Sequence, residues 1–153
     1  MILRPDELER VRAQAEAEYP AECCGVLLTR GAPTPDRVLL PCRNIQDELH
    51  AKDPVRHPRK SGTAYFIDPK DLLTIGRREA QGYRVAAIYH SHIDTGAYFS
   101  PTDRQNALVN GEPAYPEAVY VVVSVVERRM VDAAAFVWDP ATRDFVPTEL
   151  KSS

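Results

Sequence analysis

The segment from His90 to Asp103 carries polar side chains at a spacing suited to metal binding. His90 and His92 are two residues apart, and in an extended backbone such residues point to the same face of the strand. Ser100 and Pro101 are typical of a helix start, with serine as the N-cap and proline at the first helical position. Asp103 then falls in the first turn, where the helix dipole favours an ionised carboxylate. These local patterns predict that two imidazoles and one carboxylate converge.

Three such side chains are typical of a catalytic zinc site. A structural zinc ion has four protein ligands, whereas a catalytic one keeps a position for water. Each part of the pattern also has an ordinary explanation. The serine–aspartate pair alone is a common helix cap, His90 alone would end a strand, and His92 alone would lie in a solvated loop. The conjunction of all these residues favours a metal ion, with His90, His92 and Asp103 as its ligands.

Glu22 is a further candidate, because it directly precedes residues 23–28, an apolar run typical of a buried strand. A metal-bound water needs a nearby base that accepts its proton and passes it to a leaving amine, and a glutamate at a strand edge can do so. A plain surface carboxylate remains an alternative for Glu22. Cys23 and Cys24 remain alternative thiolate ligands or a nucleophile, although free cysteine is usually a small core residue and the spacing matches no zinc finger.

Length and composition favour one domain, residues 1–153, with a substantial core, since 44% of the 153 residues are apolar. A net charge of −3 gives no basic surface of the kind that binds nucleic acid or anionic membranes. The N-terminus lacks an apolar signal segment, and no apolar run is long enough to span a bilayer. The odd number of cysteines, 3, fits a reducing compartment. We therefore expect a cytoplasmic protein.

Strand-like and helix-like segments are interspersed, which predicts an α/β fold with a mixed sheet and helices on its faces. Helices are expected at 6–18, from 69 to about 82, and from 101 to about 111. The second of these is expected to turn Leu72, Leu73 and Ile75 inward. Strands are expected at 23–28, 36–42, 64–67, 84–89, 118–126, 130–138 and 145–150, with 118–126 central. Residues 44–63 are polar and aperiodic, so a long functional or mobile loop is expected there.

Taken together, Glu22, the segment Tyr89-His90-Ser91-His92 and the pair Ser100-x-x-Asp103 resemble the JAMM signature of the MPN-plus metallopeptidases. The resemblance covers most of the chain and implies a curved mixed sheet flanked by helices, related to the cytidine deaminases. It implies one zinc ion on His90, His92 and Asp103 with water as fourth ligand, Glu22 as general base, and Ser100 hydrogen-bonded to the water or the oxyanion. Family members cut the peptide or isopeptide bond after the Gly-Gly tail of ubiquitin or a ubiquitin-like protein, which is the implied partner.

The chain departs from the family pattern in two ways. Many members have proline after the second histidine, where this chain has Ile93; the ligands stay intact, but the path of the next loop is left open. The chain is also too short for the large insertions of the eukaryotic deubiquitinases. It therefore resembles the compact prokaryotic members, among them the sulfur-carrier peptidases that remove an amino acid such as cysteine from the carrier.

Other functions remain as alternatives. A non-catalytic MPN-type scaffold would share the fold, although such members usually lack one or more ligands. Asp94-Thr95-Gly96 matches the aspartic protease triplet, but those enzymes need two copies and the sequence has one. A cysteine–histidine peptidase would use Cys24. A zinc deaminase would need His-x-Glu and Pro-Cys-x-x-Cys, and the sequence contains neither. DNA-repair-associated relatives exist, but the acidic balance argues against direct DNA binding.

Overall fold

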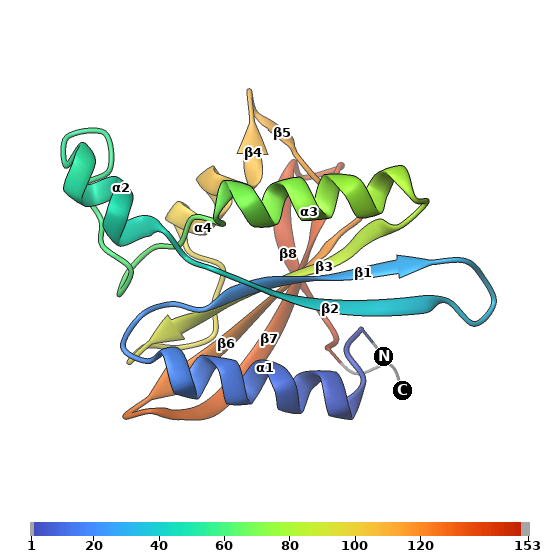
Figure 1. The fold of residues 1–153 in the computed structure, drawn as a ribbon, viewed down its shortest axis with the longest axis horizontal. Helices are drawn as coiled ribbons and strands as arrows, with labels where there is room; N and C mark the ends of the chain where they lie inside the picture. Colours follow the sequence, from blue (N-terminus) through green and yellow to red (C-terminus); the bar gives the residue numbers. More distant parts are fainter. Residues whose placement is uncertain (1, 151–153) are drawn as a thin grey trace.

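A six-stranded mixed sheet lies at the centre of the computed structural model, which describes residues 2–150 (Figure 1). Its strand order is β2-β1-β3-β6-β7-β8; β3 and β6 are parallel, and the other neighbours are antiparallel. The predicted α/β fold is confirmed, with β6 in the middle of the sheet beside β3. In chain order the elements are α1 (Pro5–Glu18), β1 (Cys24–Arg30), β2 (Asp36–Cys42), α2 (Gln46–Lys52), α3 (Pro69–Ala80), β3 (Arg84–Ile93), α4 (Pro101–Ala107), β4 (Leu108–Val109), β5 (Glu112–Pro113), β6 (Val119–Val126), β7 (Arg129–Asp139) and β8 (Asp144–Thr148).

Helices cover both faces of this sheet (Figure 1). On one face, Val11 and Ala15 of α1 pack against a core that includes Tyr89 of β3. On the other face, Ile75 of α3 packs against a second core that includes Ile88 of β3. A single strand supplies both cores because its successive side chains point to opposite faces. No helix among the described residues is long and apolar enough to cross a membrane.

The helix α3 differs from the prediction in which side chains it buries. Asp68 caps it as expected by accepting a hydrogen bond from the Lys70 amide at 2.9 Å, and Ile75 is 2% exposed. Leu72 and Leu73, predicted to point inward, are 41% and 57% exposed. Leu73 lies two residues before Ile75, about 200° around the helix, and so faces away from the sheet. The prediction for these two leucines was wrong because α3 contacts the sheet along a narrow stripe.

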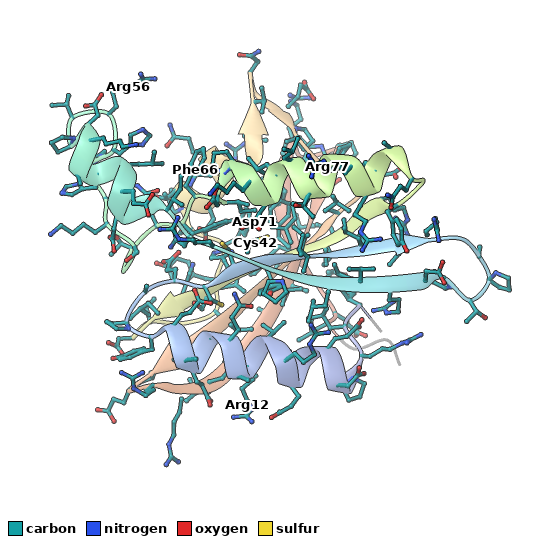
Figure 2. All side chains as sticks on the ribbon, in the orientation of Figure 1. Arg12, Cys42, Arg56, Phe66, Asp71 and Arg77 are labelled. Carbon is teal, nitrogen blue, oxygen red and sulfur yellow. The ribbon has the colours of Figure 1, made fainter. Side chains whose placement is uncertain are left out.

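Residues 44–63 are not the structureless loop that was expected. They contain α2, and residues 46–60 form a lobe that projects beyond the sheet (Figure 1). Figure 2 shows Arg56 at the outer end of this lobe. The strand predicted at 64–67 is reduced to one isolated bridge between Asn44 and Ile67. Its backbone bonds instead to a side chain: Asn44 donates to the Ala64 carbonyl at 3.2 Å and accepts from the Phe66 amide at 3.0 Å. The Phe66 carbonyl also accepts a hydrogen bond from the Ile45 amide at 2.9 Å, so a side chain replaces only part of the strand pairing.

The helix α4 ends at Ala107 rather than near Gly111. Asn110 and Gly111 have positive φ angles of 53° and 79° and join the short strands β4 and β5. An Asn-Gly pair is the preferred connection of a two-residue hairpin because both positions need positive φ. The pair was interpreted as a helix end, whereas here it forms a hairpin turn.

Candidate metal centre

Both histidines of the predicted site lie on β3, between β1 and β6. The strand runs on to Ile93, past its predicted end at Tyr89, so His90 and His92 are held by sheet hydrogen bonds. They alternate with Tyr89 and Ser91 and therefore point to the face that α3 and α4 cover. His90 is fully buried and His92 is 4% exposed. Side chains on such a strand are fixed in position before any ligand arrives.

Asp103 reaches the histidines from the first turn of α4. Ser100 is the N-cap, accepting a hydrogen bond from the Asp103 amide at 3.0 Å, while the Ser100 amide donates to Asp103 Oδ2 at 3.0 Å. The carboxylate lies 3.1 Å from His90 Nε2 through Oδ1 and 2.9 Å from His92 Nε2 through Oδ2. Ligand atoms of the three side chains all lie within 4.8 Å of one another. The structure thus brings together the three residues singled out in the sequence.

The hydrogen bonds around this group leave room for a cation. His92 Nδ1 lies 3.0 Å from the Gly96 carbonyl, a contact that fixes the ring with its Nε2 turned to Asp103. Nε2 and Asp103 Oδ2 are 2.9 Å apart, so these two atoms share either a proton or a metal ion. The fully buried ring of His90 makes no well-formed hydrogen bond among residues 2–150, although its Nε2 lies 3.1 Å from the Asp103 carboxylate; buried polar atoms are rarely left so. A nitrogen-and-oxygen set of this kind fits zinc.

The pKa values of the group reflect this charge arrangement. Burial alone would raise the pKa of Asp103, but its contacts with His90 and His92 outweigh burial and hold the pKa well below the usual range. Burial lowers the pKa of His92, yet the hydrogen bond and charge of Asp103 raise it above its ordinary value. The site is therefore an ionised carboxylate facing imidazoles, which strongly favours added positive charge.

Glu22 is positioned by the pairing of β1 with β3. Cys24 lies opposite His90 in this antiparallel pair, so Glu22, two residues earlier, comes level with His92. The backbone between them is fixed, since the Ser91 amide donates to the Cys23 carbonyl at 3.1 Å. Glu22 is 4% exposed, and its Oε1 has no hydrogen-bond partner among the described residues. Burial raises the pKa of this carboxyl to about 8.

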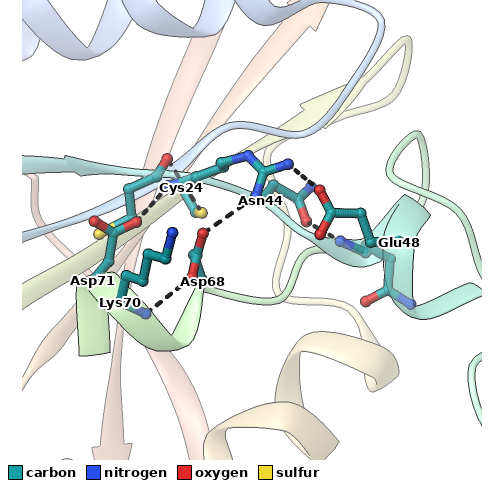
Figure 3. Close-up of polar contacts among 9 residues, drawn as sticks. Cys24, Asn44, Glu48, Asp68, Lys70 and Asp71 are labelled. Atoms are coloured by element: carbon teal, nitrogen blue, oxygen red, sulfur yellow. Dashed lines mark hydrogen bonds and ion pairs between the residues drawn. The ribbon is translucent and has the colours of Figure 1, made fainter. Parts of the chain in front are cut away.

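Two hydrogen bonds from the segment after β2 hold the Glu22 backbone in place. Its amide donates to the Ser61 carbonyl at 2.7 Å, and its carbonyl accepts from Asn44 at 2.9 Å. Figure 3 shows Asn44 beside a cluster in which Arg43 pairs with Asp68 and Glu48. The carboxyl of Glu22 and the imidazole of His92 line the same cleft, of about 220 Å³.

A model of the prokaryotic homologs of the JAB domain matches residues 5–138. The chain belongs to this family. The resemblance to JAMM proteins seen in the sequence is therefore confirmed, together with the fold that it implied.

Two curated relatives and one solved structure place this JAB domain among its family. It is 31% identical over 126 residues to the CysO-cysteine peptidase of Mycobacterium tuberculosis, covering 81% of this chain and 73% of that protein. It is 30% identical over 122 residues to the desampylase of Haloferax volcanii, covering 79% and 75%. A solved structure, protein DSY2949 from Desulfitobacterium hafniense, superposes with a TM-score of 0.65 at 21% identity, covering 95% of this chain and 87% of that one. The last likeness supports the fold alone.

Two alternative catalytic features of the sequence have structural explanations in this JAB domain. Cys23 and Cys24 are free thiols with no exposed surface, and burial raises the pKa of Cys23 to about 12, which disfavours the thiolate needed for attack. Asp94 accepts hydrogen bonds from the Tyr19 hydroxyl, at 2.8 Å, and the Glu127 amide, at 3.0 Å. It therefore ties the β3–α4 loop to neighbouring segments.

Three residues around the JAB-domain site were not among the site residues predicted from the sequence. Tyr65 stacks on His90 with ring centroids 4.6 Å apart, and Tyr98 meets His92 edge-on at 4.9 Å. Arg59 lines the cleft beside Glu22. All three lie in loops, where no hydrophobic periodicity indicates the direction of a side chain. Their proximity to the site depends on the tertiary fold.

Proposed function

We propose that this JAB domain is a zinc metallopeptidase that hydrolyses the peptide or isopeptide bond after the Gly-Gly tail of a ubiquitin-like or sulfur-carrier protein. The observation that carries the proposal is the pairing of a buried donor set, His90, His92 and Asp103, with a buried unpaired carboxyl, Glu22, in reach of one cleft. The relatives named as a CysO-cysteine peptidase and a desampylase support this class of reaction.

The roles of the residues follow from their positions. Zinc on His90, His92 and Asp103 would lower the pKa of a water molecule to about 7 and polarise the scissile carbonyl. Glu22 accepts a proton from the attacking water and returns it to the leaving nitrogen. Its burial, which raises the pKa, favours the protonated form from which the proton is returned. The Ser100 oxygen already accepts the Asp103 amide hydrogen, so its own hydroxyl hydrogen is free to stabilise the developing oxyanion.

The proposed partner is a small carrier protein with an extended tail. An exposed tail can enter a cleft of about 220 Å³, whereas a folded domain cannot. Neither nucleic acid nor membrane is part of the proposal. We place the reaction in the cytoplasm, in keeping with the three free buried thiols.

The test is to incubate the zinc-loaded protein with a ubiquitin-like carrier extended by one residue beyond Gly-Gly and to weigh the products by mass spectrometry. We expect removal of that residue by the wild type and no removal by Glu22→Gln or Asp103→Asn. His57→Ala serves as control, because this histidine lies outside the cleft. Equal cleavage by all four proteins would refute the assignment.

Zinc content separates the peptidase from a non-catalytic scaffold. Metal analysis after dialysis should give one zinc ion per wild-type chain and per Glu22→Gln chain, because Glu22 is proposed as a base and not as a ligand. Asp103→Asn should lose at least about a hundredfold in affinity, since a ligand matters more than an outer contact worth ten- to a hundredfold. A wild-type protein without stoichiometric zinc would be a scaffold.

A further inference from the structure

We propose that Arg59 binds the free α-carboxylate of the amino acid that leaves, which makes the protein a carboxypeptidase acting on the last residue of its carrier rather than an isopeptidase. This inference rests on the proposed function and specifies its substrate. It assigns a role in recognition to a residue of the segment between β2 and α3.

The composition of the cleft is the first argument. Arg59 is the one cationic side chain among its lining residues, and Glu22 is the one acidic one. The other lining residues are neutral, several of them threonines and aromatic or aliphatic side chains. At about 220 Å³ the cleft is smaller than the roughly 300 Å³ at which pockets for drug-sized ligands begin. Its size suits a small group, and Arg59 is the lining residue that can pair with an anionic one.

The chemistry of the leaving group is the second argument. The leaving nitrogen must lie at Glu22, because that carboxyl returns the proton to it. In a terminal amino acid the carboxylate sits on the carbon next to this nitrogen, so it lies on the Glu22 side of the cleft. In an isopeptide the leaving nitrogen ends a lysine side chain, and no carboxylate is nearby. A cation beside Glu22 therefore favours a terminal amino acid.

The placement of Arg59 is the third argument. Gln46 of α2 donates to the Arg59 carbonyl at 3.0 Å. Two residues on, Ser61 bonds to Asp47 through its amide and its hydroxyl, both at 2.8 Å, and the Ser61 carbonyl accepts the Glu22 amide at 2.7 Å. The chain at Arg59 and just after it is thus tied to α2 and to the Glu22 backbone.

The guanidinium itself remains free to bind. Arg59 is an exposed residue that lines the cleft, and among residues 2–150 its guanidinium makes no hydrogen bond or ion pair. Arginine binds carboxylates through two parallel N–H donors, a geometry that lysine cannot reproduce. A fixed backbone and an unpaired guanidinium are what a carboxylate receptor requires.

The experiment compares two carriers that differ only at the last group. Both end in Gly-Gly-Ala, one with a free carboxylate and one with a carboxamide. For the wild type we expect kcat/KM to be about ten- to a hundredfold lower on the amide, the usual loss for a charge-assisted hydrogen bond. Arg59→Gln should cleave the acid slower by the same factor and should no longer distinguish the two, and Arg59→Lys should recover part of the difference. Arg56→Gln, which removes a cation from the outer end of the same lobe, should keep the wild-type ratio.

Binding provides a readout that does not depend on turnover. In zinc-loaded Glu22→Gln protein the acid carrier should bind about tenfold or more tightly than the amide, and adding Arg59→Gln should remove the preference. Equal rates and equal affinities of the wild type for the two carriers would overturn carboxylate recognition. So would a uniform loss on both carriers in Arg59→Gln, which would place Arg59 against the carrier itself. Absence of any cleavage with the binding preference intact would overturn the proposed peptidase activity instead.

Discussion

Glu22 makes the metal-free protein less stable than it could be, and Glu22→Gln should reveal by how much. The carboxyl is 4% exposed with an unpaired Oε1, and burial raises its pKa from an ordinary 4.5 to about 8. Between these two pH values the unfolded chain has released the proton, while the folded protein still holds it. Unfolding is then favoured as pH rises, so the wild type loses stability through this window and glutamine does not.

The size of the effect follows from the two pKa values. Each pH unit between 4.5 and 8 costs the wild type about 1.4 kcal/mol relative to a residue that does not titrate. Over the whole window the difference reaches about 5 kcal/mol, a large part of the 5–15 kcal/mol that stabilises a typical domain. Below pH 4.5 the carboxyl is neutral in both states and the difference vanishes.

Urea unfolding in the presence of a chelator, at pH 5 and at pH 8, measures this difference. Glu22→Gln should gain stability over the wild type between the two pH values, whereas Glu117→Gln, which alters an exposed carboxylate, should follow the wild type at both. If the curves of the wild type and Glu22→Gln stayed parallel from pH 5 to pH 8, Glu22 would be ionised in the fold and the reasoning on its burial would be wrong.

Three further predictions concern stability away from the site. A Cβ at Gly25 would lie 2.1 Å from the Tyr89 hydroxyl oxygen, so Gly25→Ala should lower the free energy of unfolding by about 3 kcal/mol or more. Gly76 lies in helix α3 with open space around it, so Gly76→Ala should raise the free energy of unfolding by about 0.5–1 kcal/mol. Urea titrations decide both, and a harmless Gly25→Ala would contradict the packing. Burial raises the pKa of Glu7, but its bonds to Arg37, one of them 2.6 Å long, lower it overall. Wild type should therefore exceed Glu7→Gln by about 3 kcal/mol in the free energy of unfolding at pH 7. This advantage should shrink as pH falls below 4.5, and an advantage that does not shrink there would refute the assignment.

The metal-binding group was predictable because each part of it is local. Residues two apart on a strand share a face, which is enough to pair His90 with His92. A serine before proline starts a helix, and that fixes the direction of Asp103 relative to Ser100. No local pattern shows that the strand with the histidines and the helix with Asp103 meet in space. Their convergence was inferred because this combination of residue types and spacing rarely arises by chance.

The loop residues that surround the metal-binding group and its cleft could not be predicted in the same way. Arg59 and Tyr65 reach the site through a segment whose path is set by the side chain of Asn44 and by the Asp47–Ser61 pair. Polar side chains that bond to distant backbone leave no periodic pattern in a sequence. The exposure of Leu73 was missed for a related reason, since the sequence shows that a helix is amphipathic but not how wide its contact will be.

The two halves of the site are attached to the fold in different ways. His90 and His92 are part of a central strand, and any change in their backbone would disturb the sheet. The segment that carries Arg59 is instead held at two points, by the hydrogen bond from Gln46 of α2 to the Arg59 carbonyl and by the hydrogen bond from the Glu22 amide to the Ser61 carbonyl. Insertions or deletions between these two attachment points would alter what the cleft admits and leave the proposed metal ligands untouched. Under the proposed function, a change of carrier would therefore require edits to a single surface segment, and the reaction would stay the same.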